Sequence, residues 1–84
     1  MKGITDSGFE FEVEEAALDD WDFVEALAEL EEKPQNIVKA AKILLGKDQV
    51  NRLREHNRKG ERVSLTGMSN DIMSIMNNIK KGKN

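Results

Sequence analysis

Side chains that could carry out chemistry are scarce in this 84-residue chain. It has no cysteine and a single histidine, His56, so neither a thiolate metal site nor a histidine cluster can form. A nucleophile needs an activating base nearby in the fold, and His56 is the only imidazole. It falls on the polar side of a basic helix, where an exposed histidine is expected. The sequence therefore predicts no catalytic residue, no metal and no cofactor, and we do not expect an enzyme.

Acidic residues gather in two clusters, at Glu10, Glu12, Glu14 and Glu15 and at Asp19, Asp20 and Asp22. The first could supply paired carboxylates, but no pocket is implied around it, and a solvated strand face is the simpler interpretation. The second lacks the alternate acids, central glycine and closing glutamate of an EF-hand loop, so helix capping is expected. No phosphate-binding glycine loop is present, since Gly82-Lys83 lacks the earlier glycine and the following Ser or Thr.

The length predicts one domain, residues 1–84, with residues 1–7 and 80–84 flexible. A chain of this size buries only about 60–65% of its unfolded surface, so a partner chain is a natural further source of stability. The first six residues contain no apolar run, and the longest apolar stretch, Ile43–Leu45, is too short to cross a membrane. We therefore expect a cytoplasmic protein without membrane contact.

The charge is distributed unevenly along the chain. Residues 1–33 contain twelve acids and two bases, a net charge of −10, whereas residues 34–84 contain four acids and eleven bases, a net +7, for a total of −3. The acidic part can fold against the basic part of the same molecule. It can also stack on the basic part of another copy, so self-association, head to tail, is a second expectation.

One short strand is predicted near the N-terminus. Residues 8–13 alternate apolar and acidic side chains with a period of two, which indicates a strand with one dry and one solvated face. A strand needs a partner, and the candidates are the first residues around Ile4 or the segment Arg62–Leu65. The edge of another copy is a third option.

The first helix is predicted from a cap at Asp19 to about Lys33, because the residue before Pro34 avoids helical dihedrals. Its apolar residues cover roughly 180° of the helix, whereas a surface helix needs only about 100°. This helix therefore lies centrally in the core or keeps a second face for a partner. The apolar residues are Phe23, Val24, Leu27, Ala28 and Leu30, with Trp21 at the edge.

Three further helices follow. Apolar residues at helical spacing predict helices over 34–46 and 49–58, separated by Gly46 and with Asp48 as the cap of the latter. The inner stripe of the helix over 34–46 consists of Ile37, Val38, Ala41, Leu44 and Leu45. Residues 61–65 look extended, and a last helix starts at Thr66 or Ser69. The prediction is a mainly α single domain with about four short helices and one or two short strands near the N-terminus.

The last helix offers the best candidate surface for a protein partner, because it carries an apolar stripe within about 100° of arc, formed by Met68, Ile72, Ile75, Met76 and Ile79. Methionine adapts its shape and suits surfaces that accept varied helices. Core packing is the simpler interpretation of this stripe, and also of Trp21, which is the other candidate anchor. Met73 lies just off the stripe and is the member most expected to be exposed. The partner-binding candidates are Trp21, Met68, Ile72, Met73, Ile75, Met76 and Ile79.

A helix-turn-helix DNA-binding regulator is the alternative function. The helices on either side of Gly46 form such a unit, with Arg52, Arg54, Arg58 and Lys59 on or just beyond the second. The turn is generic, however, and the acidic first third would repel phosphate unless it folds away. Nucleic-acid binding is therefore the less favoured prediction.

The layout resembles the small tail assembly chaperones of long-tailed bacteriophages and prophages. The resemblance covers most of the chain and depends on four segments: the strand 8–13, the acidic helix start 19–21, the turn 44–49 and the basic ending 83–84.

The resemblance implies a partner, a location and a second product. Such a chaperone binds the tape measure protein in the host cytoplasm, keeps it soluble, helps recruit tail tube protein and is absent from the finished virion. Many members are also made as a longer, frameshifted product. Lys81-Gly82-Lys83 can be encoded as AAG-GGA-AAG, which contains a slippery heptamer of the type this family uses.

Overall fold

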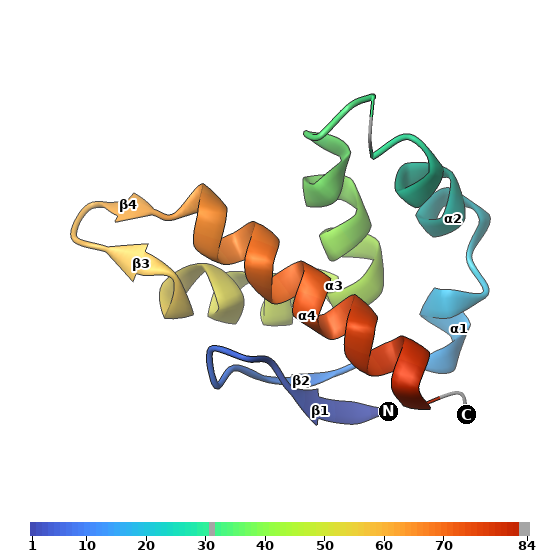
Figure 1. Ribbon diagram of the computed structural model, residues 1–84, viewed down its shortest axis with the longest axis horizontal. Coiled ribbons are helices and arrows are strands. Elements are labelled where there is room, and N and C mark those ends of the chain that lie inside the picture. Colours follow the sequence, from blue (N-terminus) through green and yellow to red (C-terminus); the bar gives the residue numbers. More distant parts are fainter. Residues whose placement is uncertain (31, 83–84) are drawn as a thin grey trace.

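The computed structural model describes the backbone of residues 1–30 and 32–82 and the side chains of residues 1–30 and 32–79. Within that part of the chain, four helices and two small antiparallel strand pairs form one compact unit (Figure 1). This architecture confirms the predicted mainly α fold. The elements are β1 (Lys2–Ile4), β2 (Glu10–Glu12), α1 (Glu15–Leu18), α2 (Trp21–Ala28), α3 (Asn36–His56), β3 (Arg58–Lys59), β4 (Arg62–Val63) and α4 (Leu65–Gly82).

The predicted strand is present as β2, and its partner is the N-terminal strand β1. Ile4 of β1 lies opposite Glu10, so the first of the candidate partners is the one observed, and Arg62 and Val63 pair with β3 instead. The period of two places Phe9, Phe11 and Val13 in the core and the intervening glutamates in solvent.

Much of the N-terminal segment expected to be flexible is held in this hairpin. The N-terminal ammonium group of Met1 donates a hydrogen bond to the carbonyl of Val13 at 2.8 Å. Gly3 allows the ring of Phe11 to cross the strand, because a Cβ at Gly3 would lie 2.7 Å from the ring Cζ. At the other end, α4 continues to Gly82, and residues 83–84 of the expected flexible tail lie outside the described residues.

The acidic segment after β2 forms two helices where one was predicted. The short α1 comes first, and α2 then begins after Asp20, whose carboxylate accepts a hydrogen bond from the N–H of Phe23 at 3.1 Å. The predicted cap at Asp19 is therefore one residue early. The helix also ends at Ala28 instead of Lys33. After Ala28 the hydrogen bonds no longer follow the α-helical pattern, since the N–H of Leu30 donates to the carbonyl of Leu27, three residues earlier, at 3.2 Å.

A bend at Gly46 divides α3 into two halves that point in different directions, the green and the yellow segments in Figure 1. Gly46 has φ 79° and ψ 166°, a conformation that only glycine adopts without strain. The predicted break between two helices at Gly46 is therefore confirmed. The predicted cap Asp48 lies inside the second half, because the helix resumes directly after the bend.

Replacing Gly46 by alanine should reduce the free energy of unfolding by about 1–3 kcal/mol, the cost of a strained backbone conformation. The cost comes from the backbone alone, since a Cβ at this position meets no atom within 4 Å. Urea denaturation followed by circular dichroism measures the change. Lys39→Ala, an exposed substitution in the same helix, is the control; equal stability of the two variants would show that the bend does not require glycine.

The second hairpin leads directly into α4. β3 pairs with β4 around Gly60, which has φ 66°, and the N–H of Gly67 donates to the hydroxyl of Ser64 at 3.0 Å. Ser64 therefore caps α4, and the predicted caps Thr66 and Ser69 were too late. The reason is that the chain passes from β4 into the helix with only Ser64 between them.

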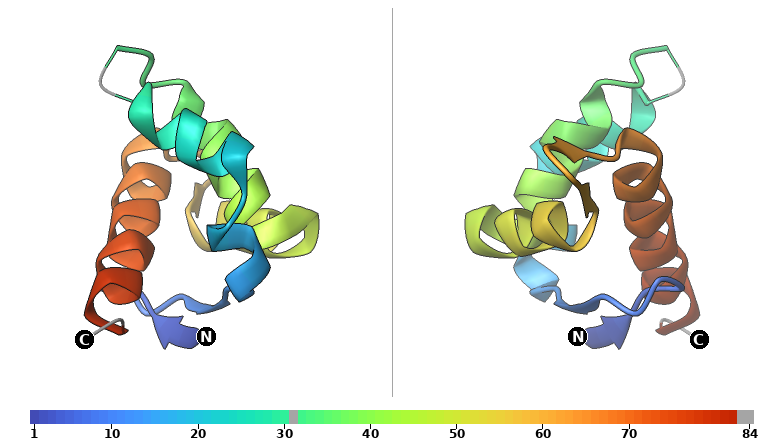
Figure 2. Two further views of the ribbon diagram at one scale, coloured as in Figure 1. Left: turned by 90° about the vertical axis from the view of Figure 1, so that its right-hand side faces the viewer. Right: turned by 90° about the vertical axis from the view of Figure 1, so that its left-hand side faces the viewer.

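The core lies where α2, α3, α4 and the first hairpin meet (Figure 2). Helix α2 packs against α3, and β1 lies against α4. Among the described residues, no helix is long and apolar enough to cross a lipid bilayer. The buried core residues are Phe9, Phe11, Val13, Phe23, Ala26, Ile37, Ala40, Ala41, Leu44, Leu45, Val50, Leu53, Ile72, Ile75 and Ile79.

Candidate protein-binding groove

Most of the predicted partner-binding stripe on α4 lies inside the molecule. Ile72, Ile75 and Ile79 have exposed fractions of 4%, 0% and 6%, which makes them core residues. Met68 and Met76 are partly buried against the same core. Core packing, the simpler interpretation of this stripe, therefore describes five of the candidates, although Met68 and Ile72 also line one of the hollows described below.

The other two candidates are exposed. Met73 has an exposed fraction of 52%, as its place beside the stripe predicted. Trp21 has an exposed fraction of 78%, so the expectation that it packs in the core was wrong. The reason is that α2 begins at Trp21 and turns Phe23 and Ala26 toward α3, which leaves the indole on the opposite face.

His56 belongs to a polar cluster that joins three distant parts of the chain. The hydroxyl of Ser7 lies 2.9 Å from Nε2 of His56 and 2.6 Å from Oδ1 of Asp71. The side-chain amide of Asn57 donates to Oδ2 of Asp71 at 2.9 Å. Asp71 is buried, with 2% exposed, and the cluster therefore links the tip of the first hairpin to α3 and α4.

The hydrogen bonds of this cluster hold the hairpin tip in place. Ser7 has one hydroxyl proton, which it donates to Asp71, and its contact with Nε2 of His56 is a hydrogen bond in the tautomer that carries a proton on Nε2. In that tautomer the imidazole donates to the serine, which is the reverse of a nucleophile–base pair. Within the described residues, no three His, Cys, Asp or Glu side chains are placed to hold a metal ion.

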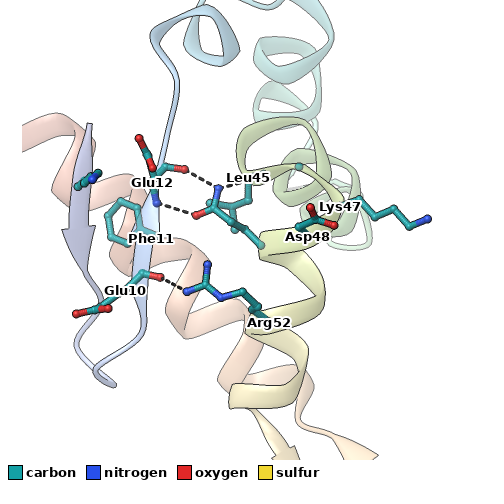
Figure 3. A pocket seen from close by; sticks show the side chains of 10 residues that line it. Glu10, Phe11, Glu12, Leu45, Lys47, Asp48 and Arg52 are labelled. Atoms are coloured by element: carbon teal, nitrogen blue, oxygen red, sulfur yellow. Dashed lines mark hydrogen bonds between the residues drawn. The ribbon is translucent and has the colours of Figure 1, made fainter.

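A polar hollow of about 580 Å³ lies between β2 and the second half of α3 (Figure 3). The side-chain amide of Gln49 both accepts from the N–H of Glu12 and donates to its carbonyl, each at 2.7 Å. Arg52 donates to the carbonyl of Glu10 at 3.3 Å. These hydrogen bonds occupy the outward edge of β2 and attach the first hairpin to α3. The hollow therefore does not offer an open strand edge to a partner.

A second hollow, of about 690 Å³, is mainly apolar and lies between the two halves of α3, β4 and the start of α4. We call it the groove. Three cationic side chains, Lys42, Lys47 and Arg54, line it, and none of the described lining residues is acidic. Its apolar lining consists of Ile37, Val38, Ala41, Val50, Val63, Leu65, Met68 and Ile72.

Two of the apolar side chains in the groove are exposed to solvent. Val38 has an exposed fraction of 52% and Leu65 of 72%, and the described part of the chain does not cover them. Sequence reasoning placed Val38 on the inner stripe of its helix and Leu65 in an extended segment, and so missed both. The bend at Gly46 shapes the groove, because residues from both halves of α3, on either side of the bend, line it.

The arginines of the second half of α3 and of β3 are mostly engaged within the chain. Arg52 lies over the ring of Phe9, 5.4 Å from its centroid, in addition to its bond to β2. Arg58 donates to the carboxylate of Glu55, which lowers the pKa of Glu55 below its ordinary value. Arg54 lines the groove. A DNA-binding surface would need these side chains directed at phosphates.

Comparisons of the chain with protein-family models, with curated proteins and with solved structures found no match.

Proposed function

We propose that this protein is a non-catalytic chaperone that binds an amphipathic helix of a client protein in the groove. The observation that carries the proposal is the pair of uncovered apolar side chains, Val38 and Leu65, in an apolar hollow of about 690 Å³. Concave apolar surfaces with a few charged groups are typical of helix-in-groove recognition.

The resemblance to tail assembly chaperones suggests the client. A tape measure protein is a long helical protein whose apolar face stays exposed until the tail tube surrounds it. A small helical protein with an open groove is suited to cover such a face and keep the client soluble. We propose the tape measure protein as the client, the tail tube protein as a further partner, and the bacterial host cytoplasm as the place of action.

The energetic basis is the burial of apolar surface. Fully burying a Val or Leu side chain contributes about 1.5–3 kcal/mol, and only part of this appears as affinity because the two proteins lose freedom on binding. Lys42, Lys47 and Arg54 add charge selectivity, since they favour a client helix with acidic residues beside its apolar stripe.

Introducing glutamate at both Val38 and Leu65 is expected to weaken client binding at least tenfold, because the charges would be buried in the interface. The measurements are the soluble fraction of a co-expressed tape measure fragment from the same genome and the dissociation constant for that fragment. Met73→Glu is the matched control, since Met73 is as exposed as Val38 but lies outside the groove lining.

Two results would contradict this proposal. Loss of client binding in Met73→Glu, with binding retained in the groove variant, would place the client on α4 instead. A duplex-DNA affinity that falls steeply between about 50 and 200 mM salt, without client binding, would favour the DNA-binding regulator. The bend in α3 and the basic residues of the second hairpin are the features that such a regulator would use.

A further inference from the structure

Helix α2 has a second face that nothing in the described chain covers. At about 100° per residue, Trp21, Val24 and Ala28 fall within roughly 60° of one another, and all three are exposed. The opposite face holds the buried Phe23 and Ala26. The apolar residues of this helix therefore divide between the core and an outward surface, which we call the α2 face.

The α2 face is acidic as well as apolar. The indole N–H of Trp21 donates to the carboxylate of Glu25 at 3.2 Å, so this acid lies beside the tryptophan on the same face. Asp22, in the first turn, is exposed next to it. A large aromatic side chain surrounded by acids is a suitable anchor for an apolar site with a basic rim.

The groove has the complementary properties. Its lining is mainly apolar, and Lys42, Lys47 and Arg54 provide its charge without any acid among the described lining residues. An eight-residue helix is about 12 Å long, so the α2 face presents a compact surface. A tryptophan buries about 150–250 Å² of surface when it is enclosed. Docking of Trp21 in an apolar site would therefore contribute a large hydrophobic free energy that the monomer lacks.

We propose that the α2 face of one copy docks into the groove of a second copy, with Trp21 and Val24 against the apolar lining and Asp22 and Glu25 beside the cations. In each molecule the two surfaces lie on opposite sides of the first half of α3. Figure 2 shows α2 nearest the viewer in one view and the β3–β4 hairpin nearest in the opposite view. The contact is therefore head to tail, and repetition of it produces rings or open rows of copies.

This inference means that self-association regulates access of a client to the groove. It rests on the proposed function only where it concerns the client. The same groove cannot hold an α2 face and a client helix at once. Copies without a client therefore associate with one another, and a client helix separates them by competing for the groove. Self-association thereby protects Trp21, Val38 and Leu65 from water until a client is present.

Two variants separate head-to-tail docking from every other mode of association. The first, Trp21→Ala with Val24→Ala, removes the α2 face and keeps the groove; the second, Val38→Glu with Leu65→Glu, blocks the groove and keeps the α2 face. All four positions are exposed, so both variants should retain the circular dichroism spectrum of the parent protein.

Sedimentation velocity over a range of concentrations is the experiment. The parent protein and the Met73→Glu control should form species whose size increases with protein concentration. Their self-association should be weaker at high salt, because the contact includes opposite charges. Each variant alone should remain monomeric, with self-association at least tenfold weaker. An equimolar mixture of the two should form a dimer and nothing larger, because one intact α2 face and one intact groove remain.

A parent protein that stays monomeric at the highest concentration would overturn the inference, and so would a mixture that forms no dimer. Client binding can be tested separately from self-association, because the α2-face variant keeps an intact groove. If the parent protein is monomeric and the α2-face variant binds the tape measure fragment, only self-docking is wrong. If the copies associate as described but neither the parent protein nor the α2-face variant binds the fragment, only the proposed client is wrong.

Discussion

Replacement of Leu53 by alanine is expected to lower the free energy of unfolding by about 3–5 kcal/mol, the largest effect we foresee for any single substitution. Leu53 has no exposed surface and lies in the second half of α3, within the core. Removing its three outer carbons leaves a cavity that the surrounding helices can close only in part. A domain of this size has roughly 4–12 kcal/mol of stability in total, so much of it would be lost.

Chemical and thermal denaturation measure this loss. At about 4–8 °C per kcal/mol for a domain of this length, the melting temperature should fall by at least roughly 12 °C. Leu65→Ala is the matched control, because the same atoms are removed from a leucine that is 72% exposed, and its stability should change by less than about 0.5 kcal/mol. Similar losses in the two variants would mean that α3 does not pack as described.

Removal of the Asp71 carboxylate is expected to produce the second-largest loss, about 2–4 kcal/mol in the variant Asp71→Ala. Asp71 accepts hydrogen bonds from Ser7 and from Asn57 while only 2% exposed. Without the carboxylate, two hydrogen bonds to a charged acceptor are lost, and a bond of that kind contributes about 1.5–3 kcal/mol. The loss should also loosen the hairpin tip. The Ser7–Asp71 bond joins that tip to α4, across 64 positions of sequence.

A double-mutant cycle with Ser7→Ala tests the arrangement. Ser7→Ala alone should cost less, about 1 kcal/mol, because the carboxylate keeps its bond to Asn57. The double variant should be more stable than the sum of the single effects predicts, since the Ser7–Asp71 hydrogen bond is counted in both single variants but is lost only once. Strictly additive effects, measured by urea denaturation, would show that the two side chains do not interact.

Both stability predictions bear on function through the groove. Leu53 lies on the core side of the second half of α3, and Asp71 precedes Ile72, which lines the groove. The groove variants themselves act at exposed positions and leave this core intact. Loss of partner binding without loss of stability is therefore the signature of the groove variants, and loss of stability is the signature of Leu53→Ala and Asp71→Ala.

The sequence predicted well those features that depend on local periodicity or on single special residues. The alternation over residues 8–13 predicted the dry face of β2, and the helical spacing of Ile72, Ile75 and Ile79 marked the inward side of α4. Gly46 predicted the break in α3, because a backbone conformation open only to glycine leaves its mark in the residue type. Helix starts were less accurate, since several neighbouring residues can act as caps and the path of the chain selects one of them.

The candidate site was largely invisible in the sequence. The α4 stripe drew the partner-binding prediction because methionine and isoleucine look the same whether they contact a core or a partner. Val38 and Trp21 seemed internal for the same reason, since apolar character shows that a side chain avoids water but not what covers it. Only the exposed fractions of these side chains, 52% and 78%, separate them from the core.

By itself, then, the sequence determined the mainly α class, the position of the bend and the separation of acidic from basic charge, because each is written in consecutive residues. Only the tertiary structure decided which apolar residues remain uncovered. The bend at Gly46, which the sequence does predict, sets the two halves of α3 at an angle, and residues of both halves line the groove. The packing of α2 on α3, and the positions of β4 and α4, decide which apolar side chains are covered. That packing joins residues far apart in the chain, and no local pattern records it.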